Sequence, residues 1–197
     1  MNPTISQIVI IDDHPIVAQG LKETLDSDRF SIRHVTPDAD CLTDTPSLFI
    51  IELELGTCTG FEIIERILSL SPHHRILVYT MHKKPWIIDT LHGLGIDGAV
   101  SKSEPLDTLR RAVAAIIDGD TYFSPAFSGT PAGGSSKKLS AREIEVIHHI
   151  CRGLTSKEIA DAMSISINTV NTYRRRLLTK LGTANTAELI CQTKGVI

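Results

Sequence analysis

The stretch that decides the fold of the second half of the chain reads LSAREIEVI at residues 139–147, GLTSKEIA at 153–160 and SINTVNTYRRR at 166–176. Ser140 and Thr155 are each followed three residues later by Glu, and Asn185 repeats the same spacing further on. This spacing is that of a capping box, which satisfies the free amide groups at the start of a helix. Gly153 and Gly182 stand where helices are expected to end. Together, these signals predict four short helices.

The third of these helices has one apolar stripe and one polar face. Val170, Leu177 and Leu181 share the stripe, because residues three, four or seven apart lie on the same side of a helix. The residues that face away from it are Asn171, Thr172, Arg175, Arg176 and Thr179. In the major groove, Arg binds guanine, Asn binds adenine, and the Thr methyl group contacts thymine. The pattern therefore predicts a DNA-reading helix.

Two further polar residues suit contacts to phosphate. Lys157 stands in the first turn of the preceding helix, and Thr169 stands at the start of the reading helix. Phosphate contacts fix the register of a protein on DNA but carry no sequence information. The alternative is a solvated basic face on a small helical bundle, which the length and specificity of the motif disfavour.

Charge is distributed unevenly along the chain. From residue 137 onward there are ten Lys and Arg against five Asp and Glu, a net charge of +5, so the total of −3 leaves −8 for the remainder. A basic piece on an acidic piece is typical of a polyanion-binding module carried by a domain that does not bind polyanions. Chance segregation of surface charge is the alternative, and three consecutive arginines in one helix weaken it.

A stretch rich in Pro, Gly and Ser at residues 125–138 predicts a flexible linker. It divides the chain into residues 1–124 and 139–197. In the first part, short apolar runs alternate with helical patterns, which is typical of a parallel sheet covered on both faces. The predicted strands are Gln7–Ile11, Ser31–Val35, Leu48–Ile51, Arg75–Thr80 and Ala99–Ser101. The predicted helices are Pro15–Asp26, Gly60–Leu70, Pro85–Leu94 and Pro105–Asp118. We therefore expect an α/β doubly wound domain with a five-stranded parallel sheet, followed by a small all-α domain of four helices.

Polar residues cluster where these strands end. In a doubly wound sheet, the functional site is expected at the carboxyl ends of the strands. The residues that fall there are Asp12, Asp13, Glu52, Thr80 and Lys102. Three carboxylates in one pocket repel one another, which favours either a bound cation or neutralisation by Lys102. The sequence leaves both readings open, with Mg²⁺ held by Asp13 and Glu52 in the first.

These motifs carry a family resemblance over nearly the whole chain. Residues 139–194 resemble the LuxR-type helix-turn-helix of NarL/FixJ-class response regulators, and residues 1–124 resemble a receiver domain. The resemblance implies base contacts from Asn171, Thr172 and Arg175, and phosphate contacts from Lys157 and Thr169. It also implies dimerisation through the last helix, about Asn185–Gln192. It implies double-stranded DNA as the partner, with the protein as a homodimer.

The receiver resemblance is broken at its reactive position. In that family a pair of acids holds a divalent metal, an Asp at the end of the third strand accepts a phosphoryl group, and a Thr or Ser and a Lys read the new charge. Glu52 stands at the acceptor position, and Ala99 stands where an aromatic residue is usual. We therefore predict a pseudo-receiver that requires no cofactor and is independent of phosphorylation, in which Glu52 directs its charge toward Thr80 and Lys102.

Three functions compete for this sequence. The leading one is a DNA-binding transcription factor without catalytic residues. The second is a receiver that binds a partner protein or small ligand and thereby gates the DNA-binding domain. The third, a Mg²⁺-dependent phosphatase, is disfavoured because there is no nucleophilic Asp at the third strand. We expect a cytoplasmic protein without membrane contact, because the sequence has neither a basic signal-peptide flank nor an apolar run of the ~18 residues that span a bilayer.

Overall fold

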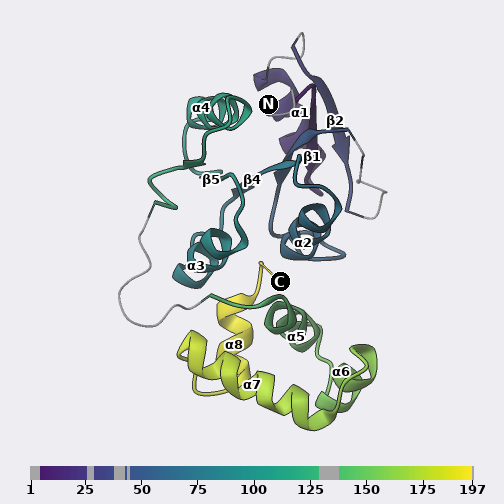
Figure 1. Cartoon of the computed structure of the whole chain (residues 1–197). Coiled ribbons are helices and arrows are strands. Elements are labelled where there is room, and N and C mark those ends of the chain that lie inside the picture. Colours follow the sequence, from purple (N-terminus) through teal and green to yellow (C-terminus); the bar gives the residue numbers. More distant parts are fainter. Residues whose placement is uncertain (1–4, 26–28, 38–42, 44, 129–137, 197) are drawn as a thin grey trace.

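The N-terminal part is a parallel sheet with helices on both faces, seen in the upper part of Figure 1. The structure is a computed structural model that describes residues 5–25, 29–37, 43, 45–128 and 138–196. The strands are β1 (Gln7–Ile11), β2 (Ser31–Val35), β3 (Ser47–Ile51), β4 (Arg75–Thr80), β5 (Gly98–Ser101) and β6 (Tyr122–Phe123). Their order in the sheet is β2-β1-β3-β4-β5-β6. The five predicted strands are confirmed.

The sixth strand was not predicted, because its two residues are too few to show a period. In β6, Tyr122 and Phe123 pair in parallel with Gly98 and Ala99 of β5. The strand adds one short partner to the edge of the sheet.

Four helices cover this sheet and follow the predicted ranges closely. They are α1 (Pro15–Thr24), α2 (Gly60–Leu70), α3 (Pro85–Leu94) and α4 (Leu106–Ile117). Successive strand residues point to opposite faces. In β1, Val9 and Ile11 belong to the apolar cluster that includes α2 and α3, whereas Ile8 and Ile10 belong to the cluster that includes α1 and α4. Both faces of the sheet are therefore buried, as the continuous apolar strands predict.

The C-terminal part consists of α5 (Ala141–Cys151), α6 (Ser156–Ala162), α7 (Ile167–Leu181) and α8 (Thr186–Thr193), so the four predicted helices are confirmed. Capping boxes start α5 at Ser140 and α6 at Thr155. At Asn185, the side chain caps α8 by accepting a hydrogen bond from the amide of Glu188. α7 ends at Gly182, whose φ of +67° is a left-handed conformation that glycine adopts without strain.

The predicted linker begins too early. Phe127 lies in the apolar core with none of its surface exposed, and its carbonyl oxygen lies 2.9 Å from Nε2 of His92. Phe127 and the partly buried Ala126 therefore pack on the core, against the expectation from the composition of residues 125–138. Most of the remaining linker, residues 129–137, lies outside the described residues. At its far end, Lys138 donates a hydrogen bond to the carbonyl of Gly93, so that end lies on α3.

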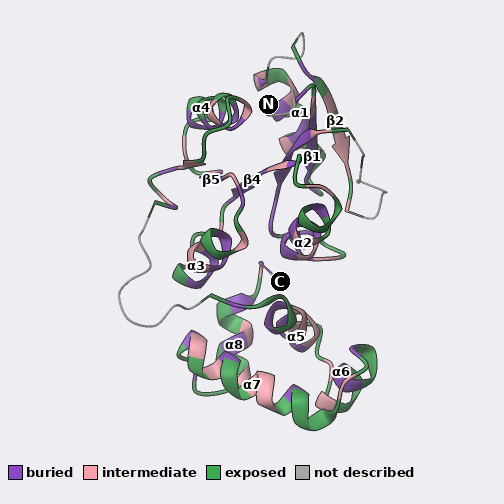
Figure 2. Ribbon diagram, viewed as in Figure 1, coloured by how far each residue is buried: buried purple, intermediate pink, exposed green. Residues whose placement is uncertain are grey.

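The two parts contact each other through α2 and α3 on one side and α5 and α8 on the other (Figure 1). Nδ1 of His148 on α5 lies 3.2 Å from a carboxylate oxygen of Glu62 on α2. The Lys84 ammonium donates to the carbonyl of Gln192, with an N···O distance of 2.5 Å. One apolar cluster contains residues of both parts. Figure 2 shows buried residues on the facing sides of α2 and α5.

Within the described residues, every helix is too short or too polar to cross a lipid bilayer.

Candidate nucleic-acid interface and acidic pocket

α7 presents the two faces that its sequence predicts. Val170, Leu177 and Leu181 are buried, with at most 4% of their surface exposed, and they anchor the helix to the domain. Asn171 and Arg175 lie on the exposed face. In Figure 1, α7 lies on the side of the helical domain away from the sheet, so the receiver does not cover this face.

The structure places the predicted DNA-contacting residues along α7 and at the start of α6. Those that are exposed are Lys157, Thr169, Asn171, Arg175 and Arg176, and Thr172 is half-buried. A shallow hollow on this face is lined by Thr172, Arg175, Arg176, Thr179 and Lys180. The Thr172 hydroxyl donates to the carbonyl of Asn168 in its own helix, at 2.9 Å. Its methyl group is therefore the part that remains for an apolar contact with a base.

Thr169 lies at the exposed start of α7. The side chain of Ser166 caps the helix by accepting from the amide of Thr169 at 3.0 Å, and the two hydroxyl oxygens lie 2.8 Å apart. Free amide groups and the helix dipole favour negative charge at such an end. The phosphate contact expected of Thr169 is compatible with this position and stays a prediction.

The three consecutive arginines have different roles. Arg174 is half-buried and donates to the carbonyl of Leu154 at 3.3 Å, so it ties α7 to the turn before α6. Burial lowers the pKa of its guanidinium below the ordinary value. Arg175 and Arg176 are exposed. Two of the three arginines are thus free to face DNA.

Lys180 stabilises the helical domain from within. Its ammonium lies 2.7 Å from a carboxylate oxygen of Glu143, which is 3% exposed. Burial raises the pKa of Glu143, but Lys180 and the Ser140 cap lower it further, so the net pKa falls below the ordinary value. The buried carboxylate is therefore kept ionised and paired.

The second candidate site is the acidic pocket at the carboxyl ends of the strands. Asp12 follows β1 and Glu52 follows β3, and both are buried. The Lys102 ammonium, after β5, lies 2.7 Å from Oδ2 of Asp12 and 2.6 Å from Oε2 of Glu52. Burial lowers the pKa of Lys102, but its hydrogen bonds and ion pairs with both carboxylates raise it above the ordinary value. One lysine therefore bridges two of the three acids.

The second carboxylate oxygen of Glu52 is also engaged. Oε1 accepts from the amides of Leu53, at 2.6 Å, and Glu54, at 3.2 Å. Hydrogen bonds from amide groups stabilise a charged carboxylate. Both oxygens of Glu52 thus have partners from the protein.

Thr80 lies in the same pocket but has a different partner. It is fully buried, and its hydroxyl oxygen accepts from the amide of His82 at 3.2 Å. Glu52 was expected to direct its charge toward both Thr80 and Lys102. Its ion pair in the structure is with Lys102.

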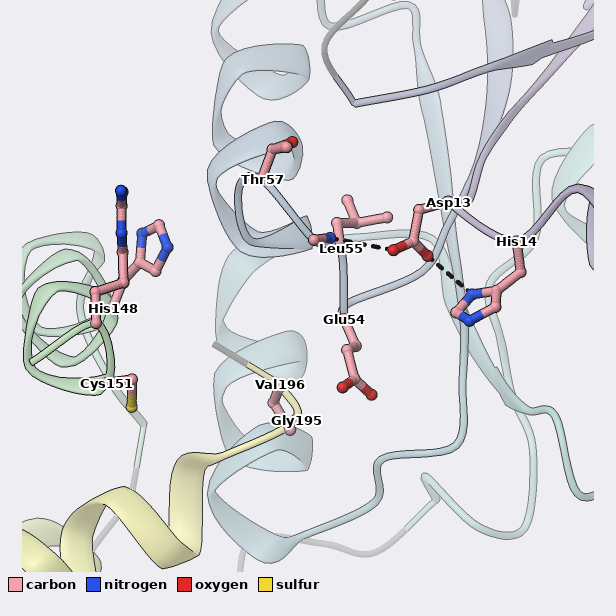
Figure 3. A pocket seen from close by; sticks show the side chains of 11 residues that line it. Asp13, His14, Glu54, Leu55, Thr57, His148, Cys151, Gly195 and Val196 are labelled. Atoms are coloured by element: carbon pink, nitrogen blue, oxygen red, sulfur yellow. Dashed lines mark hydrogen bonds and ion pairs between the residues drawn. The ribbon is translucent and has the colours of Figure 1, made fainter.

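Asp13 has partners other than Lys102. Its carboxylate accepts from the amide of Gly56 at 3.1 Å, and its other oxygen lies 2.8 Å from Nδ1 of His14, as drawn in Figure 3. Among the described residues, the group whose ligand atoms could share a cation is Asp12, Asp13 and His14. Metal binding by Asp13 and Glu52 was predicted and stays a prediction. The donor set fits it poorly, because Oε2 of Glu52 already lies 2.6 Å from the Lys102 ammonium and Oε1 accepts from two backbone amides.

A basic reading helix held outward and a receiver-like pocket define a class of two-domain, DNA-binding regulators. Residues 8–114 match the response regulator receiver domain, and residues 137–193 match the bacterial regulatory proteins of the luxR family. The chain belongs to the response regulators with a receiver domain and a LuxR-type helix-turn-helix, and it is a DNA-binding transcriptional regulator of that family. The family consists of transcription factors rather than enzymes.

Relatives align with the whole chain. The chain is 31% identical to the virulence-factor regulator BvgA of Bordetella pertussis, over 94% of this chain and 95% of that protein. It is 28% identical to the transcriptional regulatory protein ComA of Bacillus subtilis, over 97% of this chain and 99% of ComA. Both domains are therefore covered in their order along the chain.

Solved structures show the same architecture. RcsB of Salmonella enterica serovar Typhimurium, bound to the promoter rprA in the presence of the phosphomimetic BeF₃⁻, is 27% identical. It gives a TM-score of 0.75 over 95% of this chain and 97% of that chain. A second RcsB–DNA complex, also 27% identical, gives 0.62 over 98% of this chain and all of that chain.

Glu54, Gly195 and Val196 carry no recognisable functional signal in the sequence. Oε2 of Glu54 lies 2.9 Å from Nε2 of His82 at the edge of the pocket. Gly195 and Val196 lie beside Glu54, as Figure 3 shows. These residues lie in two loops and in the C-terminal segment, far apart in the sequence. No local sequence pattern therefore predicts that they meet. Only the fold brings them together.

Proposed function

We propose that this regulator binds specific DNA without being phosphorylated, with Glu52 holding the receiver permanently in one state. The observation that carries this proposal is the arrangement of Glu52, whose two carboxylate oxygens meet Lys102 and two backbone amides. The resemblance implies that Lys102 reads the charge of a phosphorylated Asp. Here the carboxylate of Glu52 already pairs with Lys102.

Geometry also opposes phosphorylation at this position. Relative to Asp, Glu places its carboxylate roughly 1.5 Å further from the backbone, and a misplacement of about 1 Å can slow an in-line transfer ~10²-fold. Phosphoryl transfer depends on positioning and on neutralising charge, commonly with Mg²⁺. Both oxygens of Glu52 are engaged, and Lys102 supplies a positive charge beside it. We therefore propose that no Mg²⁺ is required.

We further propose that a homodimer reads DNA through α7. Asn171, Thr172 and Arg175 would contact bases, Arg176 would support them, and Lys157 and Thr169 would hold phosphates. RcsB dimers are bound to DNA in a solved structure. In α8, which the resemblance assigns to dimerisation, Ala187, Glu188 and Cys191 are exposed. Oxidative cross-linking at Cys191 on a palindromic duplex would report the pairing of two copies.

The experiment that tests phosphate independence compares the wild type with Glu52→Asp. Both proteins are treated with a small acyl phosphate, labelled on phosphorus, and then titrated with DNA. We expect the wild type to remain unlabelled while it binds its site, and Glu52→Asp to accept label and to bind weakly until it does. A variant that is labelled but binds DNA as tightly as the wild type before labelling would show that Glu52 does not imitate a phosphoryl group.

A second function is favoured by a cavity of about 760 Å³ between the domains. Its walls include Asp13 and Glu54 from the receiver, and His148, Cys151 and Arg152 from α5 and its end. A small ligand or a partner segment placed there would contact both domains, and would gate DNA binding by changing their separation. A change of DNA affinity that requires an added ligand or partner would favour this function over the first.

A further inference from the structure

The C-terminal segment after α8 passes between the two domains. Val196 is 1% exposed, and Gly195 has a φ of +86°. A Cβ atom built on Gly195 would lie 3.4 Å from Oε1 of Glu54 and 3.4 Å from Cε1 of His82. In Figure 3 the Glu54 side chain is directed toward Gly195 and Val196. The segment Gly195–Val196, called the tail below, therefore rests on Glu54 and His82 of the receiver, whose Oε2 and Nε2 lie 2.9 Å apart.

This seat is connected to the acidic pocket by two short hydrogen-bonded paths. The amide of Glu54 donates to Oε1 of Glu52, at 3.2 Å. The amide of His82 donates to the hydroxyl oxygen of Thr80, also at 3.2 Å. The two residues that hold the tail are therefore the ones whose backbone is fixed by the acceptor position and by the buried threonine. A change of state in the pocket would reach the tail through contacts that are already made.

Position 195 requires a residue that accepts a left-handed backbone conformation. A left-handed φ is rare in residues other than glycine and is a strong outlier for β-branched ones. This conformation belongs to the turn that follows α8, in which the amide of Val196 donates to the carbonyl of Thr193 at 3.2 Å. A Cβ atom at this position would be in ordinary van der Waals contact with Glu54 and His82. The glycine therefore fixes the turn that places the tail beside Glu54.

We propose that the tail is a latch, which holds the helix-turn-helix domain against the receiver by seating Gly195 and Val196 on the Glu54–His82 pair. The exposed face of α7 lies elsewhere on the helix-turn-helix domain. The latch therefore controls the position of this domain and leaves its DNA-reading face accessible. This inference goes beyond the proposed function, because a latch can exist whether or not Glu52 replaces phosphorylation.

The test uses the full-length protein. A residue of one domain is changed, and hydrogen exchange is measured at backbone amides of the other domain. In Gly195→Val the tail can no longer adopt its seat, and we expect the receiver amides of residues 53–57 and 82–84 to exchange hydrogen about tenfold faster. Lys194→Val is the matched control, because it introduces the same side chain one residue earlier at an exposed position. It should leave those amides unchanged.

The reciprocal variant guards against a folding defect. His82→Ala changes the receiver side of the seat, and we expect faster exchange at the amide of Val196, which donates to the carbonyl of Thr193. Amides of β1 and α7 report whether each domain remains folded. If Gly195→Val unfolds α7, the His82→Ala result decides. Unchanged exchange across the domain boundary in a folded variant would overturn the latch.

Discussion

The reading face of α7 and the acidic pocket of the receiver both concentrate charge, but they treat it in opposite ways. Arg175 and Arg176 are exposed, at the surface where DNA would bind. In the pocket, Lys102 is 14% exposed at its side chain and is bound to both Asp12 and Glu52. The charged face of α7 is thus left available for DNA, whereas the charges of the acidic pocket are already paired with one another.

In the proposed function, the receiver is retained although it no longer accepts a phosphoryl group. Buried charges are stable only when they are paired and hydrogen-bonded. In this proposal, Glu52 supplies the pairing that a transient phosphoryl group would otherwise provide. The pocket would then have a structural role, and control of DNA binding would pass to the contacts between the domains.

Of the changes considered, removal of Lys102 should have the largest effect on the acidic pocket. Lys102→Met leaves two buried carboxylates without their cation, and loss of one partner from a buried ion pair costs about 3 kcal/mol. We expect the free energy of unfolding of the receiver to fall by that amount in urea denaturation. Lys83→Met, an exposed lysine nearby, is the control. Equal stability of the two variants would mean that Lys102 does not hold the pocket together.

Removal of Arg175 should weaken DNA binding and leave the stability almost unchanged. A bidentate contact to a base contributes about 1–3 kcal/mol of discrimination, so Arg175→Ala should weaken binding to the preferred site by roughly tenfold to hundredfold. Its stability should stay within about 0.5 kcal/mol of the wild type, because the side chain is exposed. Equilibrium titration and thermal unfolding measure the two effects. Loss of stability without loss of affinity would place Arg175 in the fold rather than at the interface.

Lys157 tests the division between phosphate and base contacts. We expect Lys157→Ala to weaken specific and non-specific DNA to a similar extent and to reduce the slope of log affinity against log salt by about one. Titrations at several salt concentrations would measure it. A slope equal to that of the wild type would exclude a direct phosphate contact from Lys157.

Mg²⁺ should have the smallest effect. A ligand that binds only the folded state stabilises it by an amount that grows with the logarithm of the ratio of ligand concentration to Kd. Because Lys102 already binds both Asp12 and Glu52, millimolar Mg²⁺ should leave the midpoint of thermal unfolding unchanged. EDTA-treated protein is the reference. A saturable rise in the midpoint that disappears in Asp13→Asn would show that the acidic cluster holds the metal.

Much of the fold was predictable because local signals agree. Apolar runs marked β1 and β4 with the correct bounds, and capping boxes marked α5 and α6. Composition misled at residues 125–128, where Phe127 packs into the core although its neighbours resemble a linker. One buried aromatic residue in a Pro- and Gly-rich stretch gives no periodic signal.

The two sites were also predictable only in part. Helical spacing predicted which residues of α7 face outward, and strand ends predicted that Asp12, Glu52 and Lys102 meet. Spacing could not predict which carboxylate oxygen pairs with which donor, nor that Arg174 turns inward to Leu154. Contacts between segments far apart in the sequence, such as Gly195 on Glu54, depend on how the two domains pack.

The most direct test of the central claim is selection of binding sites from a randomised DNA pool by untreated, full-length protein, followed by titration of the selected duplex with and without an acyl phosphate. We predict enrichment of a palindromic site, a steep dependence on salt, and the same dissociation constant in both titrations. Weak, sequence-blind binding that becomes specific only after the acyl phosphate is added would contradict the claim that Glu52 replaces phosphorylation.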